Sequence, residues 1–334
     1  MSDLEKRLKD FLIEKNQPLE IVQLTTDAST REYFRVRWSE NSAIACVYPF
    51  NDLCQGQFDA FLDVTGVFQS AGLPVAEIFA ADAVKAIIIQ EDFGDVILRN
   101  YLENSDETER DIYLNEAIRL IARIQALTPK AFEMNSIASR LAFDFEKLSW
   151  ELDFFTTHYF ETLQKSPLSV TDSKLLKAEL DEVARELDGM AKVLTHRDFH
   201  AANLMLKNGE LKIIDHQDAR IGSAAYDLVS LLLDRVTTLP TPEWLAEKRR
   251  FFLSERAKLG LAEISEEDFA YEFRLQTIQR CLKAIGTFSF QAEMRGKTYF
   301  IPFIKPMFEI VLRAAENLSR FPNLQRIIKI QIEL

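Results

Sequence analysis

The spacing of apolar residues divides this 334-residue chain into two regions of different character. In the first region, Ser2 and Glu5 form a capping pair ahead of Leu8, Phe11 and Leu12, which fall on one face of a predicted short helix. β-Branched and aromatic residues then predict three strands, at 32–38, 43–48 and 86–90. We therefore expect a small, mostly antiparallel sheet with helices over residues 1–94.

Apolar residues three and four positions apart dominate the rest of the chain and predict a helical region over 95–334. Helices are expected at 106–127, 172–188, 223–236, 241–259, 265–290 and 302–319. One stretch departs from this pattern, because NLMLKNGELKIID (203–215) holds two apolar runs joined by Asn208-Gly209, a preferred β-hairpin turn. The sequence thus predicts an α+β chain with two lobes, 1–94 and 95–334.

Composition narrows the classes of protein to which the chain can belong. Lysine and arginine number 40 against 52 aspartates and glutamates, a net charge of −12, which argues against a nucleic-acid binder. No stretch resembles a signal peptide or a membrane span, so we expect a cytoplasmic protein without a membrane partner. The three cysteines lack the close spacing of a zinc site.

The segment LTHRDFHAANLML (194–206) gathers two of the four histidines, an arginine, an aspartate and an asparagine between apolar residues, and places Asp198 and Asn203 five positions apart. A second acidic segment, IIDHQDA (213–219), follows directly. The predicted hairpin folds the chain back and should bring Asp215 beside Asn203, with Asp198 facing the same cavity. Three polar groups that converge without a ligand would each cost about 1–3 kcal/mol if buried unpaired. The pattern therefore favours a functional site over simple packing.

Phosphoryl transfer from ATP uses this set of groups, because the reaction depends mainly on positioning and charge neutralisation. A carboxylate orients the acceptor hydroxyl and takes its proton, while an amide and a second carboxylate hold Mg²⁺ against the phosphates. We assign Asp198 as the catalytic base, and Asn203 and Asp215 as the metal ligands. Asp218 could add a carboxylate beside the metal or on a second one. His200 fits a substrate-binding role as well as a structural one.

The motifs carry a resemblance to a known family. His196-Arg197-Asp198, Asn203 and Asp215 resemble the catalytic and metal-binding loops of the protein-kinase-like superfamily, and HRDFHAANLML with IIDHQDARIGSAAYDL is closer to its aminoglycoside phosphotransferase and choline kinase branch. TTDASTREYFRV, IIIQEDFGD, YDLVSLLLDR and QRCLKAIGTF make the chain similar to bacterial cell-wall sugar kinases, which phosphorylate the anomeric hydroxyl of N-acetylmuramate and N-acetylglucosamine.

This resemblance extends from residue 25 to about residue 305. It implies a two-lobed kinase-like fold, ATP and Mg²⁺ as cofactors, and a small sugar as the partner. It makes Glu91, Asp92 and Phe93 the hinge whose backbone binds adenine. It also makes Asp227 a buried carboxylate that supports the catalytic loop.

The chain departs from the superfamily pattern where the phosphates of ATP would lie. The loop TTDAST has no glycine, and the following strand AIACVYPF has no lysine. Phosphate contacts are therefore expected from the backbone and hydroxyls of Asp27, Ser29 and Thr30, together with Arg31 or Arg35. Both arginines also fit a solvated strand face.

Several alternatives remain open at this point. Arg280 and Lys283, one helical turn apart, either form a salt-bridged surface or line the acceptor pocket, where a cation would suit the carboxylate of N-acetylmuramate. The acceptor could instead be an aminoglycoside or a choline-like alcohol. The absence of the lysine and of the glycines also fits a pseudokinase that only binds ligands. A metal-dependent hydrolase would use a two-metal site built from His196, Asp198, His200, Asp215, His216 and Asp218.

Overall fold

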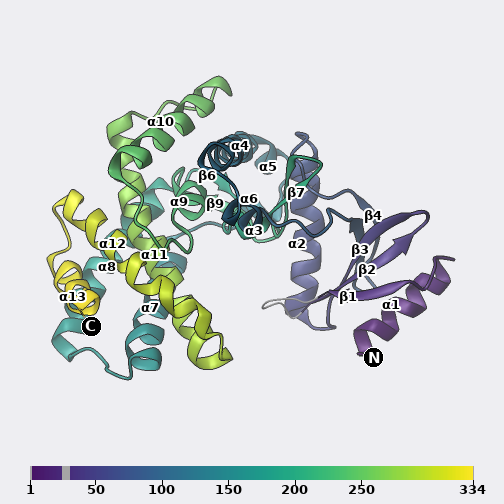
Figure 1. Ribbon diagram of the computed structural model, residues 1–334, viewed down its shortest axis with the longest axis horizontal. Coiled ribbons are helices and arrows are strands. Elements are labelled where there is room, and N and C mark those ends of the chain that lie inside the picture. The colour runs from purple at the N-terminus through teal and green to yellow at the C-terminus, as the bar shows by residue number, and fades with distance from the viewer. Residues whose placement is uncertain (1, 25–30, 334) are drawn as a thin grey trace. The chain divides into compact units, whose positions relative to one another are not determined.

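The computed structural model describes residues 2–24 and 31–333, which form two compact units (Figure 1). Unit 1 contains Met1–Arg110 and Ala201–Asp218, and unit 2 contains Asp111–His200 and Ala219–Leu334. The lobe boundary after residue 94 stays a prediction. The first segment of unit 1 ends at Arg110. Unit 1 also includes Ala201–Asp218, from the later part of the chain.

An antiparallel five-stranded sheet forms the centre of unit 1, in the order β1-β2-β3-β5-β4. The strands are β1 (Ile21–Leu24), β2 (Glu32–Trp38), β3 (Asn41–Val47), β4 (Ile78–Asp82) and β5 (Ile87–Glu91). Successive side chains point to opposite faces, so Val47 and Ile87 pack with α1 (Asp3–Glu14), whereas Cys46 and Ile88 pack with residues of α2 (Asp52–Gln69). The predicted sheet and N-terminal helix are confirmed; β1, β4 and α2 were not predicted individually.

The predicted hairpin is also confirmed and belongs to unit 1. Its strands β7 (Leu204–Lys207) and β8 (Glu210–Ile213) pair antiparallel across Asn208 and Gly209, whose positive φ angles of 54° and 81° suit this turn. The backbone N–H groups of Leu206 and Ile213 donate to the carbonyls of Val96 and Pro74, both at 2.8 Å. These bonds attach the hairpin to the N-terminal part of the chain. Beside it lie α3 (Leu98–Glu103) and η2 (Ala201–Asn203).

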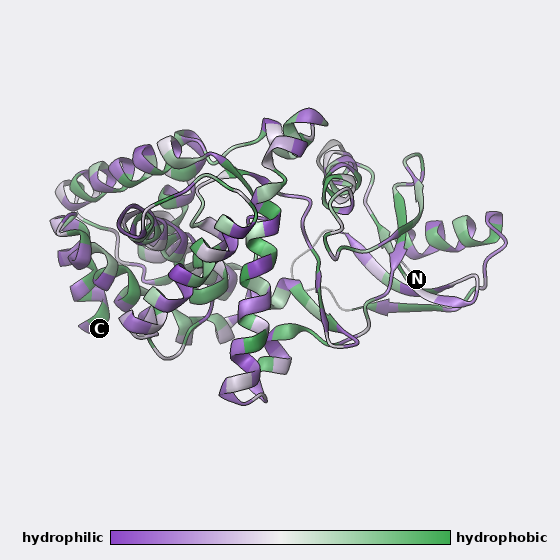
Figure 2. Cartoon of the chain, turned by 90° about the horizontal axis from the view of Figure 1, so that it is seen from above, coloured by the Kyte–Doolittle hydropathy of each residue, from purple (hydrophilic) through white to green (hydrophobic). Residues whose placement is uncertain are grey.

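Unit 2 is mainly helical, and hydrophilic and hydrophobic residues alternate along its helices (Figure 2). The long helix α11 packs against α7, α8, α9 and α12. The helices are α4 (Glu107–Ala126, which begins in unit 1), α5 (Thr128–Glu133), α6 (Ile137–Arg140), α7 (Phe145–Thr156), η1 (Thr157–Leu163), α8 (Val170–Met190), α9 (Tyr226–Leu233), α10 (Pro242–Lys258), α11 (Glu266–Arg295), η3 (Thr298–Phe303), α12 (Ile304–Leu318) and α13 (Pro322–Glu333). All six predicted helices are present, whereas α7, η1 and α13 were not predicted.

A short two-stranded sheet in unit 2 pairs β6 (Val193–Thr195) with β9 (Arg220–Gly222). The loop that follows β6 carries Asp198, so this pairing fixes where the loop begins. Within the described residues, no helix is both long enough and apolar enough to cross a membrane.

Candidate active site

The loop after β6 is held by a buried carboxylate on α9. Asp227 is fully buried, and its two oxygens accept the backbone N–H groups of His196 at 2.7 Å and Arg197 at 3.0 Å. Arg197 has a positive φ of 84°, which is uncommon for a side chain of this size, and the Asp227 bond fixes it there. Burial raises the pKa of Asp227 to about 7. The predicted support of the loop by Asp227 is confirmed.

Three cations of unit 2 surround the carboxylate of Asp198. Lys283 Nζ lies 3.3 Å and Arg280 Nη2 3.4 Å from Oδ1, and Arg197 Nε lies 3.9 Å from Oδ2. The Asp198 side chain stays 28% exposed. Burial alone would raise the pKa of Asp198, but the charges of Lys283, Arg197, Arg280 and His200 hold it well below its usual range. Asp198 is thus an oriented, ionised carboxylate with an open side.

The neighbouring predicted residues differ in how closely they contact Asp198. Arg280 is almost buried and also donates to Ser230 Oγ at 3.1 Å, so it is not part of a solvated surface. His200 is half-buried, and its backbone N–H donates to the Asp198 carbonyl at 3.1 Å. His196 is buried with its ring edge-on to Phe199, a setting that suits a structural role. The predicted substrate roles of His200, Arg280 and Lys283 stay predictions.

In unit 1, the hairpin places the two predicted metal ligands side by side along the backbone. The N–H of Ile214 donates to the carbonyl of Asn203 at 3.1 Å, directly before Asp215. Asp215 has a left-handed backbone, with φ of 61°, and its side chain is 41% exposed. Oδ1 accepts from Arg31 Nη2 at 3.1 Å and from Gln217 Nε2 at 3.0 Å. An accessible carboxylate next to an amide suits Mg²⁺, which binds oxygen ligands and keeps several waters.

Arg31 has the setting expected of a functional cation. Its side chain is only 8% exposed, and its guanidinium carbon lies 5.6 Å from the ring centres of both Tyr33 and Tyr48. A solvated strand face is therefore excluded for Arg31. The other predicted phosphate contacts, Asp27, Ser29 and Thr30, lie outside the described residues.

Arg35 takes a different role from Arg31. Its Nε donates to Asp92 Oδ2 at 2.7 Å and its Nη2 to Asp95 Oδ1 at 2.8 Å, so it fastens β2 to the predicted hinge. Partial burial by itself would raise the pKa of Asp92, but hydrogen bonds from Arg35, the Ser42 hydroxyl and the Gly94 N–H lower it. Of the two arginines, Arg31 is the one left beside Asp215.

The hinge residues are braced through their side chains. Lys207 Nζ, on the hairpin, contacts Glu91 Oε1 at 2.7 Å and the Asp92 carbonyl at 3.0 Å, and Phe93 is buried. The Glu91 N–H donates to the Glu77 carbonyl at 2.8 Å, so this group and the Asp92 carbonyl already have partners. The predicted contact of the hinge backbone with adenine would use its other polar groups. That contact remains a prediction for Glu91, Asp92 and Phe93.

The histidine of the second acidic segment is part of the core of unit 1. His216 is buried between the rings of Phe61 and Phe68 on α2, and its Nε2 shares a 2.7 Å hydrogen bond with Thr65 Oγ1. Asp218 is half-buried at the end of unit 1. Across the part of the chain that the structure describes, no group of three or more His, Cys, Asp or Glu could hold a metal ion. The burial of His216 in this apolar core argues against its predicted role as a metal ligand of a hydrolase.

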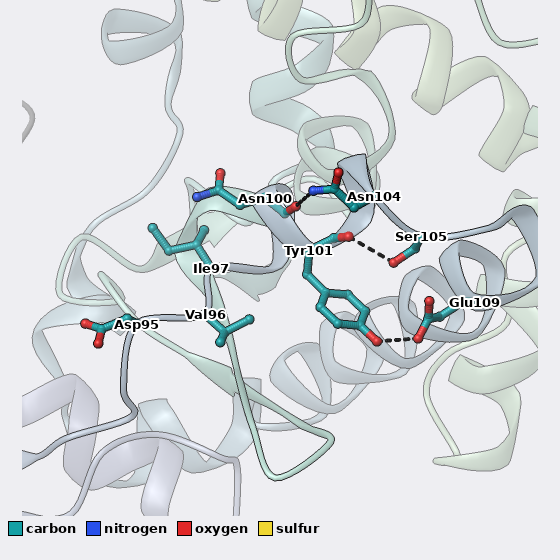
Figure 3. A pocket seen from close by; sticks show the side chains of 8 residues that line it. All are labelled: Asp95, Val96, Ile97, Asn100, Tyr101, Asn104, Ser105 and Glu109. Atoms are coloured by element: carbon teal, nitrogen blue, oxygen red, sulfur yellow. Dashed lines mark hydrogen bonds between the residues drawn. The ribbon is translucent and has the colours of Figure 1, made fainter.

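A shallow hollow of about 490 Å³ opens in unit 1 just after the hinge (Figure 3). It is lined by Asp95, Val96, Ile97, Asn100, Tyr101, Asn104, Ser105 and Glu109. The Tyr101 hydroxyl donates to the Glu109 carboxylate, and the Ser105 hydroxyl donates to the Tyr101 carbonyl at 2.9 Å. No residue assigned from the sequence lines it, so it lies apart from the predicted contacts.

Sequence reasoning missed several residues that shape these sites. Tyr33 and Tyr48 flank Arg31, and Lys207 joins the hairpin to the hinge. Tyr33 lies two positions from Arg31, on the same face of an extended segment, so alternation was a local signal for it. Lys207 and Glu91 are 116 positions apart, so no local signal identifies that pair. On α7, Lys147 and Glu151 have the spacing of an i, i+4 ion pair, and that signal was available.

Comparisons with known proteins agree with the motifs. The phosphotransferase enzyme family matches residues 20–263. The chain is 27% identical over 332 residues to the N-acetylmuramate/N-acetylglucosamine kinase of Neisseria meningitidis serogroup B, covering 98% of this chain and 95% of that protein. It is 27% identical over 310 residues to the protein of that name from Pseudomonas aeruginosa, covering 92% and 86%.

Solved structures share the fold. The ADP-bound crystal structure of aminoglycoside phosphotransferase APH(2'')-Ib superposes with a TM-score of 0.59 at 15% identity, covering 92% of this chain and 96% of that one. The predicted α+β kinase-like fold is confirmed. Because the family match covers more than half of the sequence, the chain belongs to the phosphotransferase enzyme family.

Proposed function

We propose that this protein is an ATP-dependent sugar kinase that phosphorylates the anomeric hydroxyl of N-acetylmuramate or N-acetylglucosamine. The observation that carries the proposal is the setting of Asp198, an ionised carboxylate with an open side on a loop fixed by Asp227. The relatives named N-acetylmuramate/N-acetylglucosamine kinase, aligned over most of the chain, support the choice of acceptor.

In this reaction the acceptor oxygen attacks the γ-phosphorus of ATP. The bond between that phosphorus and the β–γ bridging oxygen breaks, ADP leaves, and the hydroxyl proton passes to Asp198. The lowered pKa of Asp198 makes it a weak base. An anomeric hydroxyl is more acidic than an ordinary alcohol and asks less of such a base, which supports anomeric attachment.

Unit 1 supplies the groups for the nucleotide in this proposal. Asn203 and Asp215 would hold Mg²⁺, which neutralises charge on the phosphates when bound. Arg31 would contact the phosphates in place of the missing lysine, because it lies 3.1 Å from Asp215 and its guanidinium is held beside two tyrosine rings. The hinge backbone from Glu91 to Phe93 would bind adenine.

A direct test is a screen of amino sugars, choline and aminoglycosides for phosphorylation that requires both ATP and Mg²⁺, read by mass spectrometry. With either amino sugar, phosphorus NMR should place the phosphate on the anomeric oxygen, with loss of the reducing end. A 6-phosphate would overturn the anomeric assignment, and turnover of choline or aminoglycosides alone would overturn the sugar assignment. Protein lacking ATP turnover with every acceptor would favour the pseudokinase.

A further inference from the structure

A basic cluster extends from Asp198 to helix α7 in unit 2. Lys283, Arg280 and Arg197 lie within 3.9 Å of the Asp198 carboxylate. On α7, Glu151 Oε2 accepts from Gln279 Nε2, on the residue before Arg280, at 2.8 Å, and Lys147 Nζ lies 3.7 Å from Glu151 Oε1. The carboxylates nearby include Asp198, Glu151, Asp227 and Asp234.

The cations nearest Asp198 are committed to it. Arg280 divides its guanidinium between Asp198 and Ser230 Oγ and is only 7% exposed. Lys283 Nζ contacts the same carboxylate oxygen as Arg280. Both cations are therefore already paired with the carboxylate of Asp198. Arg280 and Lys283 therefore orient Asp198, and recognition of an acidic group requires another cation.

Lys147 provides that cation. Its ion-pair partner Glu151 lies 3.7 Å away, beyond hydrogen-bond distance, and the Lys147 side chain is 25% exposed. Glu151 is itself buried, and its other oxygen accepts from Gln279 Nε2 on α11 at 2.8 Å, so it cannot move outward with Lys147. An ammonium that is partly desolvated and only loosely paired is stabilised by an incoming anion.

Trp150 lies next to Lys147 and adds an apolar surface. Its side chain is 56% exposed, and Lys147 Nζ lies 4.0 Å from the centre of its ring. The ring of Phe154, one helical turn further on, lies 5.7 Å from the Trp150 ring at an angle of 40°. A large exposed indole with one polar neighbour is suited to pack against the apolar face of a ring-shaped ligand while the ammonium binds a charged substituent.

We propose that Lys147 and Trp150 form the acceptor-recognition surface of unit 2. Trp150 packs against the pyranose ring, and Lys147 binds a carboxylate on the sugar, so the enzyme prefers an acidic amino sugar to a neutral one. This inference rests on the proposed sugar kinase activity. The sequence suggested Arg280 or Lys283 for recognition of the acidic group. The inference assigns that role to Lys147 instead.

The test compares kcat/KM for N-acetylmuramate, which carries a carboxylate, with kcat/KM for N-acetylglucosamine, which does not. Lys147→Met should lower the ratio of the two about tenfold, as expected for loss of one charged contact, whereas Lys147→Arg should preserve most of the preference. Lys130→Met is the matched control, because Lys130 is an exposed lysine of unit 2 that pairs with Glu133 on its own helix.

Trp150→Ala tests the second half of the surface and should raise KM about tenfold for both sugars without changing the KM for ATP. Phe132→Ala, at an equally exposed aromatic residue of unit 2, is its control. An unchanged sugar ratio in Lys147→Met, or a matching rise in the KM for ATP, overturns the inference alone. Wild-type protein that phosphorylates neither sugar overturns the proposed function and this inference with it.

Discussion

Asp198 of unit 2 and Asp215 of unit 1 both have central roles in the proposed reaction, but their carboxylates have different surroundings. Asp198 has three cations within 3.9 Å and sits on a loop tied to a buried aspartate. Asp215 pairs with Arg31 at 3.1 Å, the one cation that contacts it among the described residues, and is 41% exposed. The charge of Asp198 is thus balanced by the protein itself, whereas Asp215 has room for a further positive partner. The first setting suits orientation of an acceptor, and the second suits a metal ion.

The largest effect is expected at the exposed member of this comparison. Asp215→Ala should abolish turnover, a loss of about 10³-fold or more, because the charge that would hold the metal on the phosphates is gone. The concentration of Mg²⁺ needed for half-maximal nucleotide binding should rise in the same variant. Titration of Mg²⁺ by calorimetry in the presence of ATP measures this. Unchanged Mg²⁺ affinity and rate would remove Asp215 from the metal site.

Asp198→Asn should lower kcat by roughly 10²–10⁴-fold, the usual contribution of a positioned base. In contrast to the Asp215 variant, Mg²⁺ and ATP binding should be close to wild type, because Asp198 orients the acceptor and holds no metal in the proposal. Single-turnover kinetics with saturating ATP would separate chemistry from binding. If Asp198→Asn instead weakened Mg²⁺ binding as strongly as Asp215→Ala, the division of roles between the two aspartates would be wrong.

Local sequence signals predicted those structural features of the two aspartate sites that depend on residues close together in the sequence. The hairpin was predictable because Asn208 and Gly209 supply the positive φ angles that the turn requires. The helix at 265–290 was predictable from its periodicity and from Ser265, whose hydroxyl accepts the N–H of Asp268. The bond between Asn203 and Ile214, the residue before Asp215, follows from that hairpin alone.

Features that depend on distant parts of the chain could not be predicted. The attachment of the hairpin to unit 1 rests on backbone bonds to Pro74 and Val96, more than a hundred positions earlier. The burial of Arg280 depends on how α11 packs on α7, which is so close that a Cβ on Gly286 would lie 2.7 Å from the Phe155 Cα. The sequence therefore left Arg280 undecided between a surface and a pocket. The same reason hid the contact of Lys207 with Glu91, 116 positions earlier.

Asp227, which supports the Asp198 loop, should contribute less to kcat than Asp198 itself. Asp227→Asn should lower kcat roughly 10-fold to 100-fold, because the loop is less well fixed while the base remains. Asp227 also has a pKa raised to about 7 by burial, so between about pH 4 and 7 the folded protein keeps a proton that the unfolded chain has lost. This group therefore makes the free energy of unfolding decrease as the pH rises through that range.

In the Asp227→Asn variant, this contribution to the pH dependence should vanish, and unfolding in urea at several pH values would measure it. The slope difference between wild type and variant should approach about 1.4 kcal/mol per pH unit within that window. Equal slopes for the two proteins would mean that Asp227 is ionised throughout the range.

The smallest effect is expected at Arg31. This residue pairs with Asp215 and, in the proposal, contacts the phosphates of ATP when the nucleotide binds. Arg31→Ala should raise the KM for ATP about tenfold, and more than the KM for the acceptor, because one contact with the phosphates is lost. Its requirement for Mg²⁺ should not increase, since removal of Arg31 leaves Asp215 with one cation fewer to compete with the metal. Arg35→Ala is the matched control, because Arg35 is bound to Asp92 and Asp95 at the hinge. An Arg31 variant whose KM for ATP changes no more than that of the Arg35 variant would show that the missing lysine is replaced elsewhere.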